Sequence, residues 1–317
     1  MMRWKTAAGA APGAAQAAPM DGDALFDAAF VAALEPFVLR IAQAQRGGRL
    51  AEQRSTARGQ GVDFADYKPY VEGDDLRSVD WNTYRRLGKA FVRVYEERQD
   101  LPVYLLVDLS RSMFAETPPR IQAALQTALG LAAIALHQQD NVSLLPFSDG
   151  LQAPVRALSG GQALSRVMQT LAGYRAAGGS GLAQALAQAA AMPLRRGLMV
   201  VISDFFDPAG ADAVTTALAQ VPHALLLVQM VRDHDTDPRL HPDLQGDVQI
   251  SDGESSDLLP LTLTPELVER YQSVRRAFQQ QLATAAAAVR GQHVTLDAAQ
   301  PVLAQLTALF SDGGLWL

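Results

Sequence analysis

The chain has 317 residues, of which 49% are hydrophobic and 19% are charged, enough to bury one sizeable α/β core and a smaller element. It contains no cysteine, which excludes disulfide bonds and zinc sites built on thiolates. The net charge of −6 comes without the clustered Lys and Arg of a nucleic-acid surface, and no apolar run is long enough for a membrane span, so we expect a cytoplasmic protein that binds no nucleic acid.

The N-terminal part of the chain is predicted to contain a tail, a helix and a charged segment. Residues 1–20 are rich in Ala, Gly and Pro and are predicted to be disordered. Residues 21–44 carry apolar side chains at helical spacing, which predicts one amphipathic helix. The following segment, to Asp100, mixes charged and aromatic residues and favours short strands and turns. Residues 21–100 are therefore taken as one N-terminal, β-rich region with a helix at its start.

From residue 101 to residue 317, strand-like and helix-like runs alternate. The predicted strands are 103–107, 142–147, 197–203, 224–231 and 293–296, and the predicted helices are 120–137, 161–171, 182–191, 265–289 and 301–310. This alternation predicts an α/β fold with a central, mainly parallel sheet. Two more strand-like runs flank an Asp-Gly turn and predict a hairpin inserted near residues 245–263.

A carboxylate and two hydroxyls follow the first predicted strand of this domain at alternating positions. The apolar run Val103–Val107 is typical of a buried parallel strand and leads directly into Asp108, Ser110 and Ser112. In open α/β sheets, ligands bind at the loops that follow the carboxyl ends of strands. The pattern therefore predicts a site for a hard cation.

Two later segments offer further oxygen ligands. Ser180 lies in a glycine-rich stretch just before the predicted helix 182–191, and Asp204 follows the predicted strand 197–203. Carboxylate and hydroxyl oxygens suit Mg²⁺ better than Zn²⁺, and they leave Mn²⁺ and Ca²⁺ as alternatives. Each residue alone could instead cap a helix or form a turn. Their joint occurrence after successive strands favours the metal site.

These five residues resemble the metal-ion-dependent adhesion site of von Willebrand factor A domains, whose motif is DxSxS, then a Thr, then an Asp. Asp108, Ser110 and Ser112 match the first element and Asp204 matches the last, whereas Ser180 stands where the family has Thr and keeps the hydroxyl. The resemblance implies a Rossmann-like von Willebrand factor A fold. It also implies that the hydroxyls bind the ion directly, that the aspartates often bind through water, and that an acidic residue of a partner completes the shell.

The segment before this domain carries a second resemblance. It contains the runs GQGVDFADYKPY at 59–70, EGDDLRSVDW at 72–81, YRR at 84–86 and VRVYEE at 92–97. Together with the DxSxS element, the series resembles the signature of the bacterial domain-of-unknown-function family 58. That resemblance implies an adaptor that works with a MoxR-type AAA+ ATPase and couples ATP-driven remodelling to an unidentified client protein.

Five residues of the charged segment are candidates for either a structural or a partner-binding role. They are Asp74, Asp75, Arg77, Asp80 and Trp81. The Gly-Asp-Asp sequence and the arginine predict tight turns tied by Arg–carboxylate pairs, with the aromatic residues packed beneath them. Direct contact with a partner is the alternative, and the two uses can coexist.

Enzymatic functions have weaker support. A serine hydrolase would use a Gly-x-Ser-x-Gly elbow, but Leu182 follows Ser180 where the last glycine should be. A phosphatase with Asp108 as nucleophile would more typically have a second acid where this chain has Ser110. We therefore expect a metal-dependent protein-interaction module and no enzyme. A metal-independent scaffold that binds through the charged N-terminal segment is the alternative, and a metal-dependent hydrolase is a weaker one.

Overall fold

The computed structural model describes residues 2–6, 25–47, 58–59, 63–96, 100–115, 118–238, 246–252, 258–313 and 315. The chain divides into two compact units, one made of residues 1–44 and 101–317 and the other of residues 45–100. We call them the sheet unit and the small unit. No helix in the described ranges combines the length and hydrophobicity that crossing a bilayer requires.

A six-stranded sheet forms the centre of the sheet unit. Its strands are β5 (Pro102–Asp108), β6 (Asn141–Phe147), β7 (Val155–Leu158), β8 (Leu198–Ser203), β9 (Ala224–Val231) and β12 (Gln292–Asp297). They lie in the order β12-β9-β8-β5-β6-β7, and all neighbours are parallel except the edge pair β6–β7. The strand order reverses between β5 and β8, as in doubly wound folds, which confirms the predicted Rossmann-like architecture. Ligands of such folds bind at this reversal.

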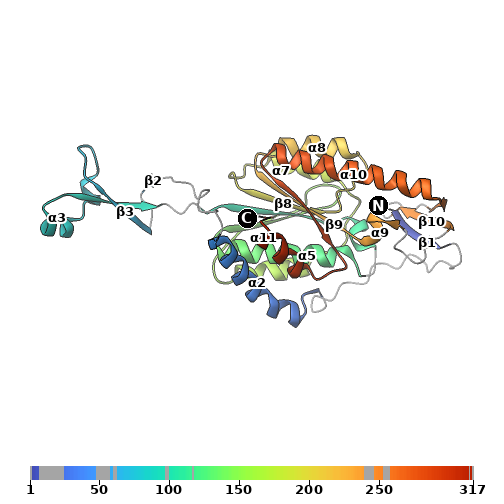
Figure 1. Ribbon diagram of the computed structural model, residues 1–317, viewed down its shortest axis with the longest axis horizontal. Coiled ribbons are helices and arrows are strands. Elements are labelled where there is room, and N and C mark those ends of the chain that lie inside the picture. Colours follow the sequence, from blue (N-terminus) through green and yellow to red (C-terminus); the bar gives the residue numbers. More distant parts are fainter. Residues whose placement is uncertain are drawn as a thin grey trace. The chain divides into compact units, whose positions relative to one another are not determined.

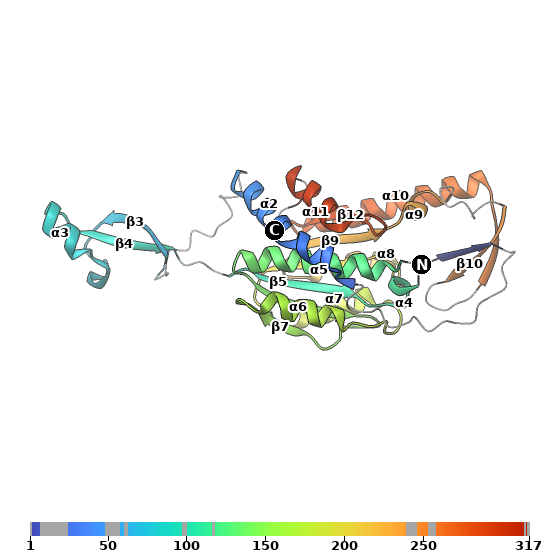
Figure 2. The same ribbon diagram turned by 90° about the horizontal axis from the view of Figure 1, so that it is seen from below.

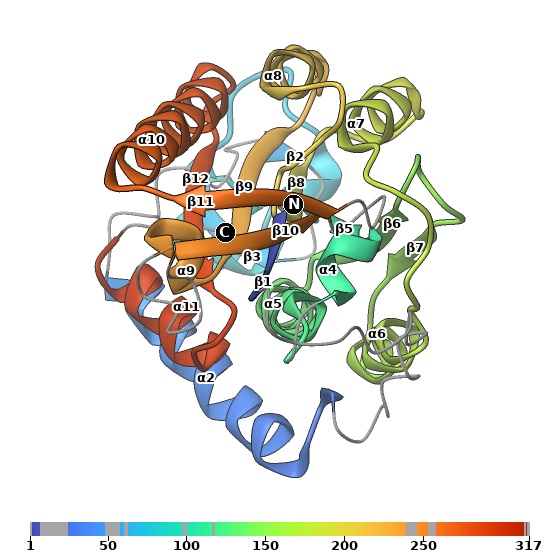
Figure 3. The ribbon, with the colours of Figure 1, turned by 90° about the vertical axis from the view of Figure 1, so that its right-hand side faces the viewer.

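Helices cover both faces of the sheet. One face carries α2 (Ala28–Gly47), α5 (Arg120–His137), α6 (Ala163–Ala172) and α11 (Val302–Ser311), and the other carries α7 (Leu182–Ala191), α8 (Ala211–Gln220) and α10 (Pro265–Ala288) (Figures 1 and 3). Every residue of β5 and β8 is buried. Leu105 joins the core on the α5 face and Leu106 joins the core on the α7 face, because successive strand side chains point to opposite sides.

Helix α2 belongs to the sheet unit, and this differs from the expected division, which grouped it with residues 45–100. Its buried residues Leu34, Phe37 and Ile41 lie in the same core cluster as α5. The side chain of Gln126 on α5 also donates a hydrogen bond of 3.0 Å to the carbonyl of Leu25. The apolar stripe of α2 must be covered by another apolar surface. Helix α5 provides that surface, because nearly all of its residues are buried and it has apolar side chains on the side toward α2 as well as on the side toward the sheet.

A second, three-stranded sheet lies beyond the end of the central sheet at which α4 (Arg111–Phe114) begins (Figure 2). It has the order β1-β10-β11 and is antiparallel throughout; the strands are β1 (Met2–Thr6), β10 (Gly246–Asp252) and β11 (Leu258–Leu263). The tail was expected to be disordered, yet its residues Met2–Thr6 form β1; residues 7–24 lie outside the described part. The predicted Asp-Gly turn of the hairpin also lies outside it. The short helix α9 (Asp233–Thr236) precedes β10 in the chain.

The small unit contains a separate antiparallel sheet of order β2-β4-β3. Its elements are β2 (Arg58–Gly59), β3 (Asp63–Pro69), the 3-10 turn η2 (Leu76–Ser78), helix α3 (Trp81–Leu87) and β4 (Phe91–Glu96). Helix α3 stands where only strands and turns were expected. Asp80 explains it, because its carboxylate accepts hydrogen bonds from the backbone amides of Asn82 and Thr83 and so caps a helix of seven residues.

Candidate metal centre

The strand register brings the two predicted carboxylates together at the reversal of strand order. Val107 of β5 lies opposite Ile202 of β8, so Asp108 at the end of β5 lies beside Ser203 at the end of β8. Asp204 follows directly. The Ser203 hydroxyl donates a hydrogen bond of 2.6 Å to Oδ2 of Asp108. Sequence reasoning missed Ser203, because a serine that ends a buried strand carries no signal until the register is known.

The DxSxS loop is folded by its own side chains. Oδ1 of Asp108 accepts a hydrogen bond of 2.8 Å from the backbone amide of Ser110. Ser110 directly precedes α4 at the N-cap position, but its side chain makes no capping hydrogen bond; its Oγ lies 3.0 Å from Oγ of Ser112. The alternative role of these serines was to cap the helix. In the structure their hydroxyls contact each other instead.

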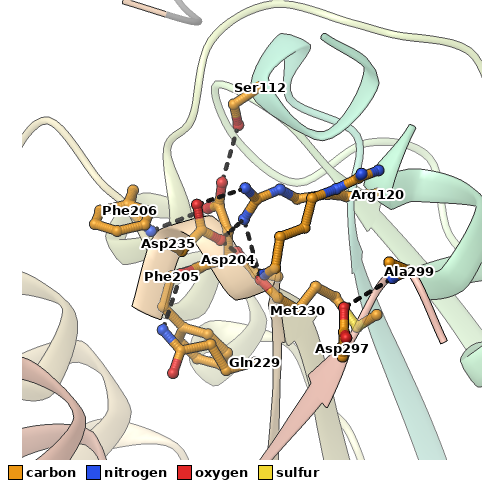
Figure 4. A network of polar contacts seen from close by, with 12 residues as sticks. Ser112, Arg120, Asp204, Phe205, Phe206, Gln229, Met230, Asp235, Asp297 and Ala299 are labelled. Carbon is orange, nitrogen blue, oxygen red and sulfur yellow. Dashed lines mark hydrogen bonds and ion pairs between the residues drawn. The ribbon is translucent and has the colours of Figure 1, made fainter. Parts of the chain in front are cut away.

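A hydrogen bond joins this loop to Asp204. The Ser112 hydroxyl donates to Oδ2 of Asp204 at 3.3 Å, and Figure 4 shows it pointing toward that carboxylate. Oδ1 of Asp204 accepts a hydrogen bond of 3.1 Å from the amide of Phe206, and its carbonyl accepts one of 3.3 Å from the side chain of Gln229. Asp204 therefore stabilises a local turn, which was its alternative role, and it also faces the DxSxS loop.

The Ser180 side chain contacts the segment that follows Asp204. Its hydroxyl donates a hydrogen bond of 2.7 Å to the carbonyl of Phe206. It does not cap α7, whose Ala183 amide is bonded to Asp207 at 2.8 Å. The structure thus connects Ser180 to the segment that carries Asp204, although none of its described hydrogen bonds joins it to the other four predicted ligands.

The glycine-rich loop around Ser180 interlocks with the loop after β6. Oδ1 of Asp149 accepts a hydrogen bond of 2.6 Å from the Gly179 amide. Gly178 has a φ of +65°, and a Cβ placed there would overlap the Asp149 carboxylate. A Cβ at Gly181 would overlap the Asp149 carbonyl. The glycines are therefore required by close approach, and Asp149 is a supporting residue that sequence reasoning missed.

The site holds two carboxylates that are shielded from water. Asp108 is 0% exposed and Asp204 is 1% exposed. Burial raises the pKa of Asp108 to about 7, with a further contribution from the negative charge of Asp204. Burial also raises the pKa of Asp204, although the positive charge of Arg120 opposes the increase. Arg120 is itself fully buried and forms an ion pair of 2.8 Å with Asp235 (Figure 4).

This arrangement fits a hard cation. Two adjacent buried carboxylates cannot both remain charged unless a positive charge compensates them. In the described part of the chain, neither Asp108 nor Asp204 forms an ion pair with a basic side chain. No group of three or more His, Cys, Asp or Glu side chains that could hold a metal occurs in the same residues, so an oxygen site here depends on hydroxyls. Such ligands suit Mg²⁺, Mn²⁺ or Ca²⁺.

The candidate residues of the small unit mostly bind its own backbone. Asp74 accepts hydrogen bonds from Lys68 Nζ at 2.6 Å and from the Val71 amide at 3.1 Å, and the bond from Lys68 is the main reason why its pKa is lowered. Asp75 accepts a hydrogen bond of 2.9 Å from the Arg77 amide. Asp80 caps α3 and also accepts one of 2.8 Å from the Tyr67 hydroxyl. These contacts support the turn-stabilising role.

Two details of that prediction are wrong. The described ion pair of these turns uses Lys68, whereas the Arg77 side chain forms none with the described residues. Trp81 is 54% exposed and meets Tyr84 edge to face, so these aromatic rings do not pack beneath the turns. Trp81 begins α3, and the cap at Asp80 directs the first turn of the helix without burying the indole.

Relatives cover most of the chain. The uncharacterized protein Rv1480 of Mycobacterium tuberculosis and the uncharacterized protein Mb1516 of Mycobacterium bovis are each 27% identical to it over 270 residues, which make up 84% of this chain and 83% of theirs. The family described as "Protein of unknown function DUF58" matches residues 66–288. The match includes all ten residues predicted from the sequence to be ligands, turn formers or partner contacts.

Several solved structures are similar over parts of the chain. An aerotolerance-related membrane protein from Bacteroides fragilis has a TM-score of 0.40 and 15% identity, over 67% of this chain and 99% of its own. The pilus adhesin SpaC from Lactobacillus rhamnosus GG has a TM-score of 0.40 and 14% identity, over 68% of this chain and 30% of its own. Manganese-loaded TRAP of Plasmodium vivax has a TM-score of 0.32 and 20% identity, over 41% of this chain and 57% of its own. Since the family match spans well over half of the sequence, the chain belongs to the DUF58 family.

Proposed function

We propose that this protein is a metal-dependent protein-interaction module whose metal centre binds a carboxylate of a partner protein. The observation that carries the proposal is the pair of buried aspartates, Asp108 and Asp204, at the point where the strand order reverses, with Ser112 of the DxSxS loop bonded to Asp204. In the described part of the chain neither carboxylate forms an ion pair with a basic side chain, and the positive charge of Arg120 only partly opposes the raised pKa of Asp204.

The residues that would hold the ion are Asp108, Ser110, Ser112, Ser180 and Asp204. Bound there, Mg²⁺ would supply a positive charge with a coordination position open to an acidic side chain of the partner. Ser110 and Ser112 present neutral oxygens that cost less to bury than further carboxylates. Ser203 and the amides of Ser110 and Phe206 hold the two carboxylates in place, so the ligand set is ordered by hydrogen bonds in advance of binding.

The proposed partner is a MoxR-type AAA+ ATPase, with this protein as the adaptor that presents a client. The support is the family membership together with what the sequence resemblance implies about that family. The partnership implies action in the cytoplasm, because an ATPase needs the ATP found there. No enzymatic role is part of the proposal.

Binding to the purified ATPase in the presence of Mg²⁺ and in the presence of EDTA tests this function. The complex is expected to form with Mg²⁺ and to be lost with EDTA. The Ser180→Ala variant is expected to bind more weakly than the parent, whereas Ser180→Thr, which keeps the hydroxyl, should bind like the parent. Unchanged binding in EDTA would contradict the metal-dependent function.

One observation favours the second candidate, a metal-independent scaffold. The small unit exposes a group of large apolar side chains on β3, η2, α3 and the adjoining turns. They are Tyr67, Val71, Leu76, Trp81, Tyr84 and Leu87. Exposed apolar clusters of this kind mark protein contacts. On this reading Trp81→Ala would reduce ATPase binding more than Ser110→Ala does, and EDTA would have no effect.

The weaker alternative, a metal-dependent hydrolase, predicts turnover of generic phosphate or ester substrates. That turnover would have to depend on added metal and disappear in Asp108→Ala. Such activity would show that carboxylate binding is not the whole function of the site.

A further inference from the structure

Two consecutive phenylalanines follow Asp204, and their side chains have opposite environments. Phe205 is 1% exposed and its ring meets His293 edge to face at 6.4 Å. Its φ is +65°, a conformation that a bulky residue rarely adopts. Backbone strain of this kind persists where the surrounding structure enforces it, often at functional sites. The strained residue turns the chain so that the next side chain points out of the core.

Phe206 is the exposed member of the pair, at 39%. Its ring stacks on Phe278 of α10, with centroids 5.8 Å apart and planes 23° apart. Its amide donates to Asp204 and its carbonyl accepts from Ser180, so its backbone connects two of the five predicted metal ligands. An exposed aromatic ring is thereby held at the rim of the candidate metal centre by contacts on both sides.

The apolar surface continues along α10. Val274 lies four residues before Phe278 and therefore on the same face of the helix, and it is 64% exposed. Exposing a valine and an aromatic ring to water has no benefit for stability. Aromatic side chains next to a polar anchoring site are typical of residues that dominate binding energy in protein interfaces.

We infer that Phe206, supported by Phe278, selects partners in which an aromatic side chain neighbours the metal-binding carboxylate. This inference rests on the proposed function and specifies the partner of the same site. Phe206 is only two residues from Asp204 in the chain, so one short partner segment can reach both the ligand set and the ring. The occupant is a segment of another protein that carries an acidic residue followed by an aromatic one.

The test uses capped dipeptides and fluorine NMR. The probe is acetyl-Glu-(para-fluoro-Phe)-amide, and the comparison peptides replace either the Glu or the fluorinated residue by Ala. Binding is measured with Mg²⁺ present for the parent, Phe206→Ala, Phe206→Leu and Leu39→Ala. Leu39 is a matched control, because it is an exposed apolar residue on α2, on the other face of the sheet. Calorimetry of Mg²⁺ alone accompanies each variant.

The complete probe is expected to bind the parent about fivefold more tightly than acetyl-Glu-Ala-amide, which is the size of effect that one aromatic contact produces. Phe206→Ala should remove this difference, Phe206→Leu should keep part of it, and Leu39→Ala should leave it intact. Mg²⁺ affinity should be the same in all four proteins. Equal Mg²⁺ affinity would show that the metal site is still folded in a variant that no longer distinguishes the two Glu peptides.

Two results would overturn the inference while leaving the proposed function intact. One is Mg²⁺-dependent binding of both Glu peptides with equal affinity to the parent and to Phe206→Ala. The other is a Mg²⁺-dependent dimer in sedimentation that Phe206→Ala abolishes, since the ring would then face a second copy of this chain. Failure of Mg²⁺ to bind the parent with or without peptide would instead contradict the proposed function, and the inference with it.

Discussion

The hydroxyl of Ser112 donates a hydrogen bond of 3.3 Å to Oδ2 of Asp204, across the point where β5 and β8 meet. It joins the loop after one strand to the loop after another, 92 positions along the chain. The carboxylates of Asp204 and of neighbouring Asp108 are buried, and each has a raised pKa. Burying these carboxylates in their charged form costs free energy of folding, and a bound cation would reduce that cost.

Without metal, the protein is expected to lose stability as the pH rises. The pKa of Asp108 is about 7 in the folded protein and about 3.9 in an unfolded chain, so its proton favours folding. The stabilisation is complete below the unfolded value and is lost as the pH rises through the folded one. Between about pH 5 and about pH 8 the free energy of unfolding in EDTA should fall by on the order of 2 to 3 kcal/mol.

Urea unfolding at both pH values measures this change, and Mg²⁺ should restore stability at the higher pH. The Asp108→Asn variant has no proton to lose at this position and should show a weaker pH dependence in EDTA, with the contribution of Asp204, whose pKa is also raised, remaining. Stability of the parent that stays constant or rises with pH in EDTA would contradict the raised pKa.

The loop of Ser180 should depend on Asp149. Removing the carboxylate with Asp149→Ala releases the Gly179 amide and is expected to weaken Mg²⁺ affinity by roughly tenfold, which is typical of groups that orient metal ligands. Calorimetry of Asp149→Ala beside Asp212→Ala, an acid in the first turn of α8, provides the measurement and its control. Equal affinities in the two variants would show that the Ser180 loop does not depend on this bond.

The contact between Gly178 and Asp149 can be tested separately by a double-mutant cycle. Gly178→Ala should destabilise the protein because the added Cβ meets the Asp149 carboxylate. Part of this cost should disappear when Asp149 is also changed to Ala, so the two effects on the unfolding free energy should not add. The part that remains reflects the φ of +65° at this position.

Removing Arg120 should destabilise the protein strongly. Arg120→Met leaves the Asp235 carboxylate buried without the ion pair of 2.8 Å, at an expected cost of about 3 to 5 kcal/mol. The change also removes the positive charge that lowers the pKa of Asp204, so Mg²⁺ binding should require a higher pH. Chemical denaturation and metal titrations over a range of pH measure both effects. A loss below about 1 kcal/mol would mean that the buried pair is not coupled to folding.

In the small unit, Asp80 should matter more than Asp75. Asp80 caps α3 through two amides and also binds the Tyr67 hydroxyl, whereas Asp75 accepts a single described bond from an amide. Asp80→Ala is expected to cost about 1 to 2 kcal/mol and to speed hydrogen exchange at the amides of α3. Asp75→Ala should have a smaller effect on the same amides. The reverse order would contradict the capping role of Asp80.

The sequence was most informative where a segment is buried on both sides. All residues of β5 and β8 are buried, so both strands appear as continuous apolar runs, and the ends of the runs indicate Asp108 and Asp204. β7 was missed because it is an edge strand with two exposed residues and a positive φ at Ala157. α8 was missed too, because only three of its residues are buried.

Contacts between distant segments could not be predicted from local pattern. Ser203 is a supporting residue only because β5 and β8 are in register, and Ser180 is attached through a main-chain carbonyl that has no sequence signature. The position of α2 on α5 also depends on tertiary packing. Periodicity predicted that α2 has an apolar stripe, but it could not predict which surface covers that stripe.

Calorimetric titration of Mg²⁺ into the purified protein tests the central claim most directly. The comparison is with the double variant Asp108→Ala, Ser110→Ala and with Ser148→Ala, which removes a buried hydroxyl just after the neighbouring strand β6. Saturable binding of one ion in the parent and in Ser148→Ala, and its loss in the double variant, is the predicted result. Equal heats in all three proteins, or no binding in the parent at a pH above 7, would contradict a metal centre at this site.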